Sequence, residues 1–233
     1  MDPRIIIPLP PESPWFSWAR PDIHHCEANG PGWITAPSDT WSNLAYLLAA
    51  LWIWRHRDEP NARALSGIVL AVGATSFFFH ASYTFFFQVF DYGGMFLYSA
   101  WILSLGLRRL GRLDQRRSRA FFFVLTSGSI GLVVIFHALG IPVQPLFGVQ
   151  AVGAVGLEAW LYLRGGENAS RRPLVAAVGL VAAGFLAWNF DHSDWFCRPD
   201  DHLFQGHALW HLLTAASFAP AFLYYRQFPE TKA

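Results

Sequence analysis

Charged side chains are scarce in this sequence, and lysine is almost missing. Only 14% of the 233 residues are charged, whereas 53% are hydrophobic and 17% are aromatic. Because soluble proteins carry about 25% charged residues, this composition disfavours a water-soluble fold. The single lysine, Lys232, stands next to the end of the chain. We therefore expect no lysine amine inside the membrane that could form a Schiff base with retinal, and this disfavours a retinal protein.

The chain also lacks a basic domain and an apolar leader. Its formal net charge is +1 and its pI about 7.9, without the basic face that tracks phosphates, so no nucleic-acid partner is expected. The N-terminal stretch, in which Ile5–Ile7 precede several prolines, has no continuous apolar core of the kind found in signal peptides. We expect residues 1–36 to rest on the outer face of a membrane. Since no repeat or long linker is present, the rest is expected to form one bundle.

Long apolar runs are what the sequence has in abundance. Seven runs reach the length of about 17–25 residues that an α-helix needs to cross hydrocarbon. They are Pro37–Trp54, Ala64–Tyr83, Phe90–Leu107, Ala120–Leu139, Pro142–Leu163, Pro173–Asn189 and Gln205–Tyr225. The predicted fold is therefore all-α: a seven-transmembrane helix bundle over residues 37–225.

The arginines predict the orientation of this bundle, because short cytoplasmic loops hold an excess of Lys and Arg. Of the 17 basic residues, 14 follow the first, third, fifth and seventh runs, and only Arg4, Arg20 and Arg198 lie on the other side. If one span were missing or wrongly added, the basic residues would be distributed over both sides of the membrane. We therefore expect the N-terminus outside and the C-terminus, with a tail at residues 226–233, in the cytoplasm.

The only two cysteines both fall on the predicted outer side. Cys26 lies in the N-terminal segment, and Cys197 lies in the connection between the sixth and seventh runs. In an oxidising compartment a disulfide between them would tie these two segments together. The alternative is a pair of free thiols, because shared compartment does not establish geometry.

Ionisable side chains inside membrane spans are costly, and here they cluster. His80 closes the second run and Asp91 opens the third, while His207 and His211 open the seventh. The i, i+4 spacing places His207 and His211 on one helix face, and Ser76 shares a face with His80 in the same way. At 1.5 Å per residue, His80 and His211 lie roughly 25 and 21 Å from the inner ends of their helices. All these groups therefore share the outer third of the membrane.

Three imidazoles with an open fourth position are typical of a catalytic zinc site. Zinc held by His80, His207 and His211 would acidify a water molecule that can attack a carbonyl. Asp91 is then the expected general base or orienting residue, and Ser76 the expected hydrogen-bond donor to the developing oxyanion. The alternative is that each histidine is a hydrogen-bonded core residue, which is the commoner fate of a single buried histidine.

The remaining polar residues of the spans have less defined roles. Glu158, well inside the fifth run, could face a cavity or pair with a neighbouring helix and is left unassigned. Ser42, Asn43 and Asn189 are interpreted as hydrogen-bond partners between helices. His137 is interpreted as a packing or interfacial residue.

Taken in order, these residues resemble the alkaline ceramidase family, within a superfamily of seven-helix membrane hydrolases that also includes adiponectin-receptor-like proteins. The matching segments are Cys26-Glu27-Ala28-Asn29, Trp41-Ser42-Asn43, Ser76 and His80 with Asp91, and Gly206-His207 with Trp210-His211. The resemblance implies a zinc-dependent amidase that cleaves ceramide to a sphingoid base and a fatty acid. It also implies ligands at His80, His207 and His211, further catalytic positions at Asp91 and Ser76, and a disulfide between Cys26 and Cys197.

A calcium site beside the zinc is also implied, but the match to it is incomplete. Glu27 and Asn29 match the acidic cluster of eukaryotic members, whereas His24 stands in place of an aspartate and Ala36 in place of a glutamate. Asp22, or else Asp39, would have to supply the missing oxygen, because calcium needs several oxygen ligands. The predicted calcium ligands are Glu27, Asn29 and Asp22.

The leading hypothesis is thus a multi-pass membrane amidase whose lipid substrate enters from the membrane, with the active site near the outer, periplasmic or luminal, side. No protein partner is implied. One alternative is a receptor-like or transport bundle with a structural zinc, and another is a hydrolase of a different lipid amide or ester. Haem ligation by two histidines, as in membrane cytochromes, leaves Ser76 and Asp91 without a role.

Overall fold

The computed structural model describes residues 9–165, 169–193 and 197–228, so Ile5–Ile7 and Lys232 lie outside it. Within these ranges every regular element is an α-helix, which confirms the all-α prediction. The helices are α1 (Pro37–Ser42), α2 (Leu44–Trp54), α3 (Ala62–Ser82), α4 (Phe85–Arg109), α5 (Gln115–Ala138), α6 (Gln144–Arg164), α7 (Arg172–His192) and α8 (Gly206–Tyr225).

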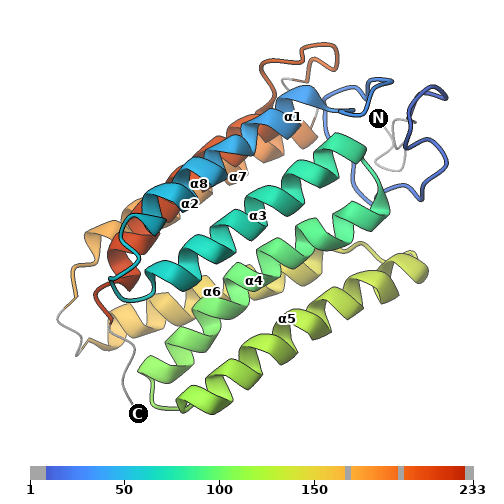
Figure 1. Ribbon diagram of the computed structural model, residues 1–233. Coiled ribbons are helices and arrows are strands. Elements are labelled where there is room, and N and C mark those ends of the chain that lie inside the picture. Colours follow the sequence, from blue (N-terminus) through green and yellow to red (C-terminus); the bar gives the residue numbers. More distant parts are fainter. Residues whose placement is uncertain (1–8, 166–168, 194–196, 229–233) are drawn as a thin grey trace.

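The helices coincide with the seven predicted spans, and the first span is divided in two. The division falls at Asn43, whose backbone remains right-handed helical, with φ −66° and ψ −16°, so α1 and α2 continue along nearly one line (Figure 1). Four helices, α3, α5, α6 and α7, are long and apolar enough to cross a membrane. The count of seven spans, the orientation of the termini and the division at residues 36 and 225 stay predictions.

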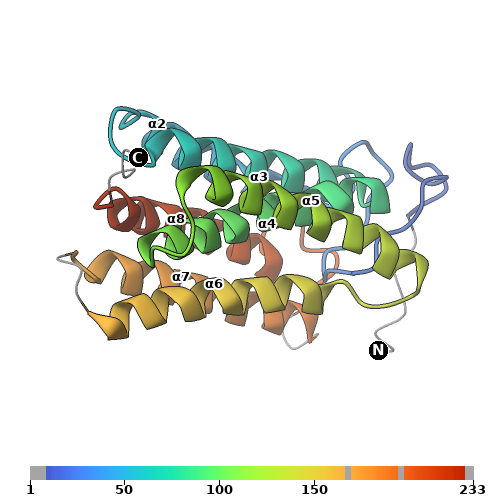
Figure 2. The ribbon, with the colours of Figure 1, turned by 90° about the horizontal axis from the view of Figure 1, so that it is seen from below.

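The bundle is elongated, and its connections gather at two ends (Figures 1 and 2). The N-terminal segment and the α7–α8 connection lie at one end, called here the histidine end because His80 and His207 are located there. The α2–α3 and α4–α5 connections lie at the other. Inside the bundle α3 packs against α2 and α4, while α8 packs against α7 and α2. The last turn of α3 and the first turn of α8 therefore meet at the histidine end.

Burial is uneven across the bundle. The main core lies among α2, α3, α4 and α8, where Leu65 and Phe222 are fully buried. On α5 and α6, by contrast, large apolar side chains such as Phe123, Val149 and Leu163 are 66%, 73% and 78% exposed. Water does not favour so much exposed apolar surface, whereas lipid tails do. The faces of these helices are suited to contact hydrocarbon.

Glu158 pairs with neighbouring helices, which was one of the two roles open to it. Its carboxylate accepts two hydrogen bonds from Arg109 of α4, at 2.8 and 2.9 Å. Tyr224 and Tyr225 of α8 donate to it at 2.9 and 3.2 Å. This buried network, which lies toward the end of the bundle opposite the histidine end, joins α4, α6 and α8.

Candidate metal centre

His80, His207 and His211 converge at the histidine end of the bundle. Their ring centroids lie 4.8 Å apart for His80 and His207, 4.9 Å for His80 and His211, and 4.5 Å for His207 and His211. All three side chains are buried. The structure therefore brings together the three residues that the spacing and depth of the sequence singled out.

The geometry of His80 and His207 fits a shared cation. Their Nε2 atoms lie 3.2 Å apart, and two ligands of a tetrahedral zinc with bonds of about 2.05 Å are separated by about 3.3 Å. The Nδ1 atom of each residue is buried without a hydrogen-bond partner among the described residues. The spacing of the two Nε2 atoms makes the pair suited to hold a metal ion.

Local structure positions each of these rings. The backbone carbonyl of His80 accepts hydrogen bonds from the Thr35 hydroxyl at 3.0 Å and from the Ala36 amide at 3.3 Å, which fastens the end of α3 to the segment before α1. Gly206 begins α8 tightly against α7, because an added Cβ would lie 2.8 Å from the carbonyl oxygen of Ala187. A glycine is thus required directly before His207.

His25 is a member of the cluster that sequence reasoning missed. Ligand atoms of His25, His80 and His207 all lie within 4.8 Å of one another, a grouping that does not include His211. Burial lowers the pKa of His25 well below 6.5, and the neighbouring imidazole of His211 lowers it further. The His25 ring is therefore neutral at pH 7 and keeps a nitrogen lone pair. Its position next to Cys26 was the only hint in the sequence.

Ser76 lies between the histidines and Asp91. Its hydroxyl oxygen is 3.4 Å from Nε2 of His211, and Ser76 also neighbours the carboxylate of Asp91 on α4. These three residues lie on α3, α8 and α4. Ser76 therefore lies beside His211, one of the predicted ligands, and Asp91 lies beside Ser76.

His211 is held by residues of the first span. Its Nδ1 atom lies 2.8 Å from the hydroxyl of Ser42 and 3.4 Å from the side-chain amide of Asn43. This confirms that Ser42 and Asn43 link helices.

The same interpretation of Asn189 is wrong, because its amide donates within α7 to the carbonyl of Phe185 at 2.6 Å. An asparagine side chain can donate to the carbonyl four residues earlier in its own helix.

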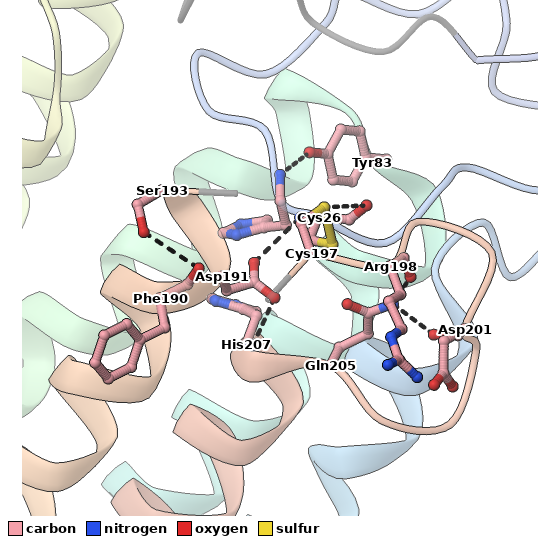
Figure 3. The surroundings of a disulfide bond; sticks show 11 residues. Cys26, Tyr83, Phe190, Asp191, Ser193, Cys197, Arg198, Asp201, Gln205 and His207 are labelled. Atoms are coloured by element: carbon pink, nitrogen blue, oxygen red, sulfur yellow. Dashed lines mark hydrogen bonds between the residues drawn. A yellow bond between two sulfur atoms is a disulfide. The ribbon is translucent and has the colours of Figure 1, made fainter. Parts of the chain in front are cut away.

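Two further carboxylates lie near the imidazoles: Asp39, which the sequence indicated only as an alternative calcium ligand, and Asp191, which it did not indicate. Asp39 Oδ2 lies 3.8 Å from Nδ1 of His80, with both side chains fully buried. Asp191, near the end of α7, accepts the His207 amide at 3.2 Å and the Cys26 amide at 3.1 Å, as Figure 3 shows. Asp191 thus satisfies a free amide at the start of α8, where negative charge is favourable.

The predicted disulfide between Cys26 and Cys197 is confirmed (Figure 3). It joins the N-terminal segment to the α7–α8 connection. The side chain of Gln205 organises the rest of that connection by donating to the carbonyl of Arg198 at 2.9 Å. The disulfide therefore holds the residues around His25 against the start of α8.

The three residues predicted to bind calcium all lie in the N-terminal segment before α1. Glu27 accepts the amides of Ser38 and Asp39, each at 2.9 Å, so its carboxylate caps the start of α1. Asp22 Oδ1 lies 2.6 Å from Nδ1 of His137, whose ring stacks on Phe85 and is thus a packing residue. Asn29 follows Glu27 in the same segment. The calcium site stays a prediction.

The chain also matches a known family at the level of sequence. A family model described as Ceramidase matches residues 23–231. The matched region begins just before His25 and includes every helix of the bundle. No curated protein matches the chain.

Proposed function

The chain belongs to the ceramidase family, and on this basis we propose that it hydrolyses the amide bond of ceramide-like N-acyl lipids at a zinc ion held by His80, His207 and His211. The products would be a sphingoid base and a fatty acid. The observation that carries the proposal is the convergence of three buried imidazoles, two of them with Nε2 atoms 3.2 Å apart. Membership of the family supports a hydrolase with a ceramide substrate.

The donor set supports zinc. Neutral imidazoles are ligands that zinc prefers, and a catalytic zinc uses three protein ligands and leaves one position exchangeable. When bound there, zinc would polarise a carbonyl oxygen and lower the pKa of a water molecule. Calcium, which takes oxygen ligands, does not fit this nitrogen set.

The neighbouring polar residues support amide hydrolysis through the chemistry that their side chains can supply. The Asp91 carboxylate can take a proton from the attacking water and return it to the leaving amine. The Ser76 hydroxyl, next to Nε2 of His211, can donate a hydrogen bond to the oxygen on which negative charge develops. Water thus adds to the carbonyl carbon, the C–N bond breaks, and the amine leaves carrying the proton.

The location of the site supports a membrane lipid as substrate. The imidazoles lie at one end of helices whose neighbours expose apolar side chains over much of their length. A ceramide lying in the bilayer has its amide near the interface and its chains in the hydrocarbon. We therefore propose an outer-side site that a lipid reaches from within the membrane, in a multi-pass protein with its C-terminus in the cytoplasm.

The test is hydrolysis of a lipid panel by the purified protein, with zinc quantified in the same preparation. The wild-type protein is expected to bind one zinc and to release sphingoid base from ceramide. The His80→Ala variant is expected to lose both, while His56→Ala serves as the matched control because His56 caps the turn after α2 at the opposite end. Release of sphingoid base by His80→Ala at the wild-type rate would refute the proposal. Turnover of other amides or esters in place of ceramide would assign the enzyme to the alternative lipid hydrolases.

One observation favours a second candidate, a receptor-like or transport bundle with structural zinc. His25 adds a fourth buried imidazole near the other three, and a filled four-ligand shell is typical of structural zinc. In that case removal of zinc with a chelator would unfold the protein, and no lipid in the panel would be turned over. For the hydrolase, turnover is expected with zinc and disappears without it.

A further inference from the structure

His25 lies next to His80, His207 and His211, and the proposed hydrolysis assigns no role to it. Its ring centroid is 3.8 Å from that of His207 and 5.2 Å from that of His80. The side chain is only 3% exposed. Its Nδ1 atom has no hydrogen-bond partner in the described part of the chain. A buried polar atom without a partner destabilises a fold, so this nitrogen calls for a ligand.

The backbone around His25 is fastened on both sides. The His25 amide donates to the hydroxyl of Tyr83 at 2.8 Å, and that hydroxyl donates to the carbonyl of Ile23 at 3.3 Å. Cys26 is joined to Cys197 by the disulfide and donates its amide to Asp191. These contacts use the backbone of His25 and leave its ring free to face the other imidazoles.

Packing alone does not account for a histidine at this position. The rings of His25 and His207 are tilted by 32° rather than parallel, and a phenylalanine would fill the same space without burying an unpaired nitrogen. His211 differs, because both of its ring nitrogens have hydroxyl neighbours, Ser42 at 2.8 Å and Ser76 at 3.4 Å. The His25 ring is thus better placed to bind a cation than to form hydrogen bonds.

We propose that His25 supplies a fourth imidazole to the metal centre, beside His80, His207 and His211. His25 is the only one of the four on a loop, whereas the others lie on α3 and α8. A catalytic zinc keeps one exchangeable position, and the loop residue is assigned to it, so hydrolysis would require His25 to give way to water there. The inference rests on the metal site of the proposed function and is independent of the identity of the lipid.

The experiment counts imidazoles by X-ray absorption spectroscopy on the zinc-loaded wild-type protein and on His25→Phe. Four imidazole nitrogens are expected in the wild-type protein and three, with one oxygen, in the variant. Zinc affinity, measured by competition with a chelator, should fall in His25→Phe by at least about tenfold. Loss of a residue that only hydrogen-bonds to a metal ligand already lowers affinity by about that factor. His24→Phe is the matched control, because His24 is the adjacent histidine, and its ring contacts His192 at 5.3 Å.

The outcomes separate this inference from the proposed function. Three imidazoles in the wild-type protein, together with unchanged affinity in His25→Phe, would overturn the role of His25 and leave the hydrolase intact. Absence of zinc from the wild-type protein would overturn both. If His25→Phe fails to fold, the wild-type spectrum alone decides, since four imidazoles support the inference and three contradict it.

Discussion

At the scale of single residues, a buried carboxylate lies next to one of the imidazoles of the site. Asp39 is fully buried, and its Oδ2 lies 3.8 Å from Nδ1 of His80, on the side of the ring away from Nε2 and His207. A carboxylate in this position favours the tautomer with a proton on Nδ1, which leaves the Nε2 lone pair for a metal. We therefore expect Asp39 to be a positioning residue that acts through His80.

We expect Asp39→Asn to weaken zinc binding by about 10–100-fold, the usual cost of removing the outer partner of a histidine ligand. The amide keeps the shape of the side chain, so folding should be retained, and chelator competition measures the affinity. The control is Asp58→Asn, at an 84% exposed aspartate paired with Arg63. Equal zinc affinity in the two variants would show that Asp39 does not act on the centre.

At the scale of elements, close helix contacts decide where the site residues meet. Gly73 of α3 lies against Tyr46 of α2, and an added Cβ would be 2.5 Å from the Tyr46 Cβ. The Tyr46 hydroxyl in turn lies 2.5 Å from that of Thr214 on α8. Small residues let membrane helices approach closely, so Gly73 allows α2 to link α3, which carries His80, with α8, which carries His211.

The Gly73→Ala substitution is expected to lower the free energy of unfolding by about 1–3 kcal/mol, because overpacking forces backbone shifts. Gly128→Ala on α5 is the control, since nothing lies within 4 Å of its added Cβ. That change should be neutral or stabilise the helix by up to about 1 kcal/mol. Thermal unfolding in detergent compares the two, and a Gly73→Ala protein as stable as Gly128→Ala would contradict the close packing.

At the scale of the whole molecule, two buried polar networks lie at different places along the bundle. The histidine cluster joins α3 and α8 to the disulfide-linked N-terminal segment, whereas Glu158 and Arg109 join α4, α6 and α8 near the opposite ends of the helices. The Arg109 guanidinium also stacks on Phe228, with 3.8 Å to the ring centroid. The two networks share α8 but no residue.

Because these networks are separate, Glu158→Ala should destabilise the fold without emptying the metal centre. Removing one partner of a buried ion pair costs about 3–5 kcal/mol, and Arg109 would lose its carboxylate. Glu59→Ala is the matched control, because Glu59 forms an ion pair with Arg226 at 3.0 Å that is partly exposed and such pairs contribute about 0–1 kcal/mol. Thermal unfolding and zinc per folded protein are the measurements. Loss of zinc from folded Glu158→Ala would show that the networks are coupled.

The sequence by itself determined the features that depend on local periodicity and on segment length. Apolar runs predicted the helices, because helix formation depends on residues that are near one another in the chain. The i, i+4 pair His207 and His211 was recognised for the same reason. Predicting that His80 lies near this pair, and that the two cysteines form a disulfide, required one further argument. Successive helix ends alternate between the two sides of a membrane, which places these residues on the same side.

Only the tertiary structure decided the contacts between segments far apart in the chain. His25 meets His207, Asp39 meets His80, and Asp191 meets Cys26, yet no spacing in the sequence relates these pairs. Glu158 found its partners on two other helices in the same way. Such contacts form because packed helices and a disulfide bring distant segments together. The spacing of residues along the chain does not predict them.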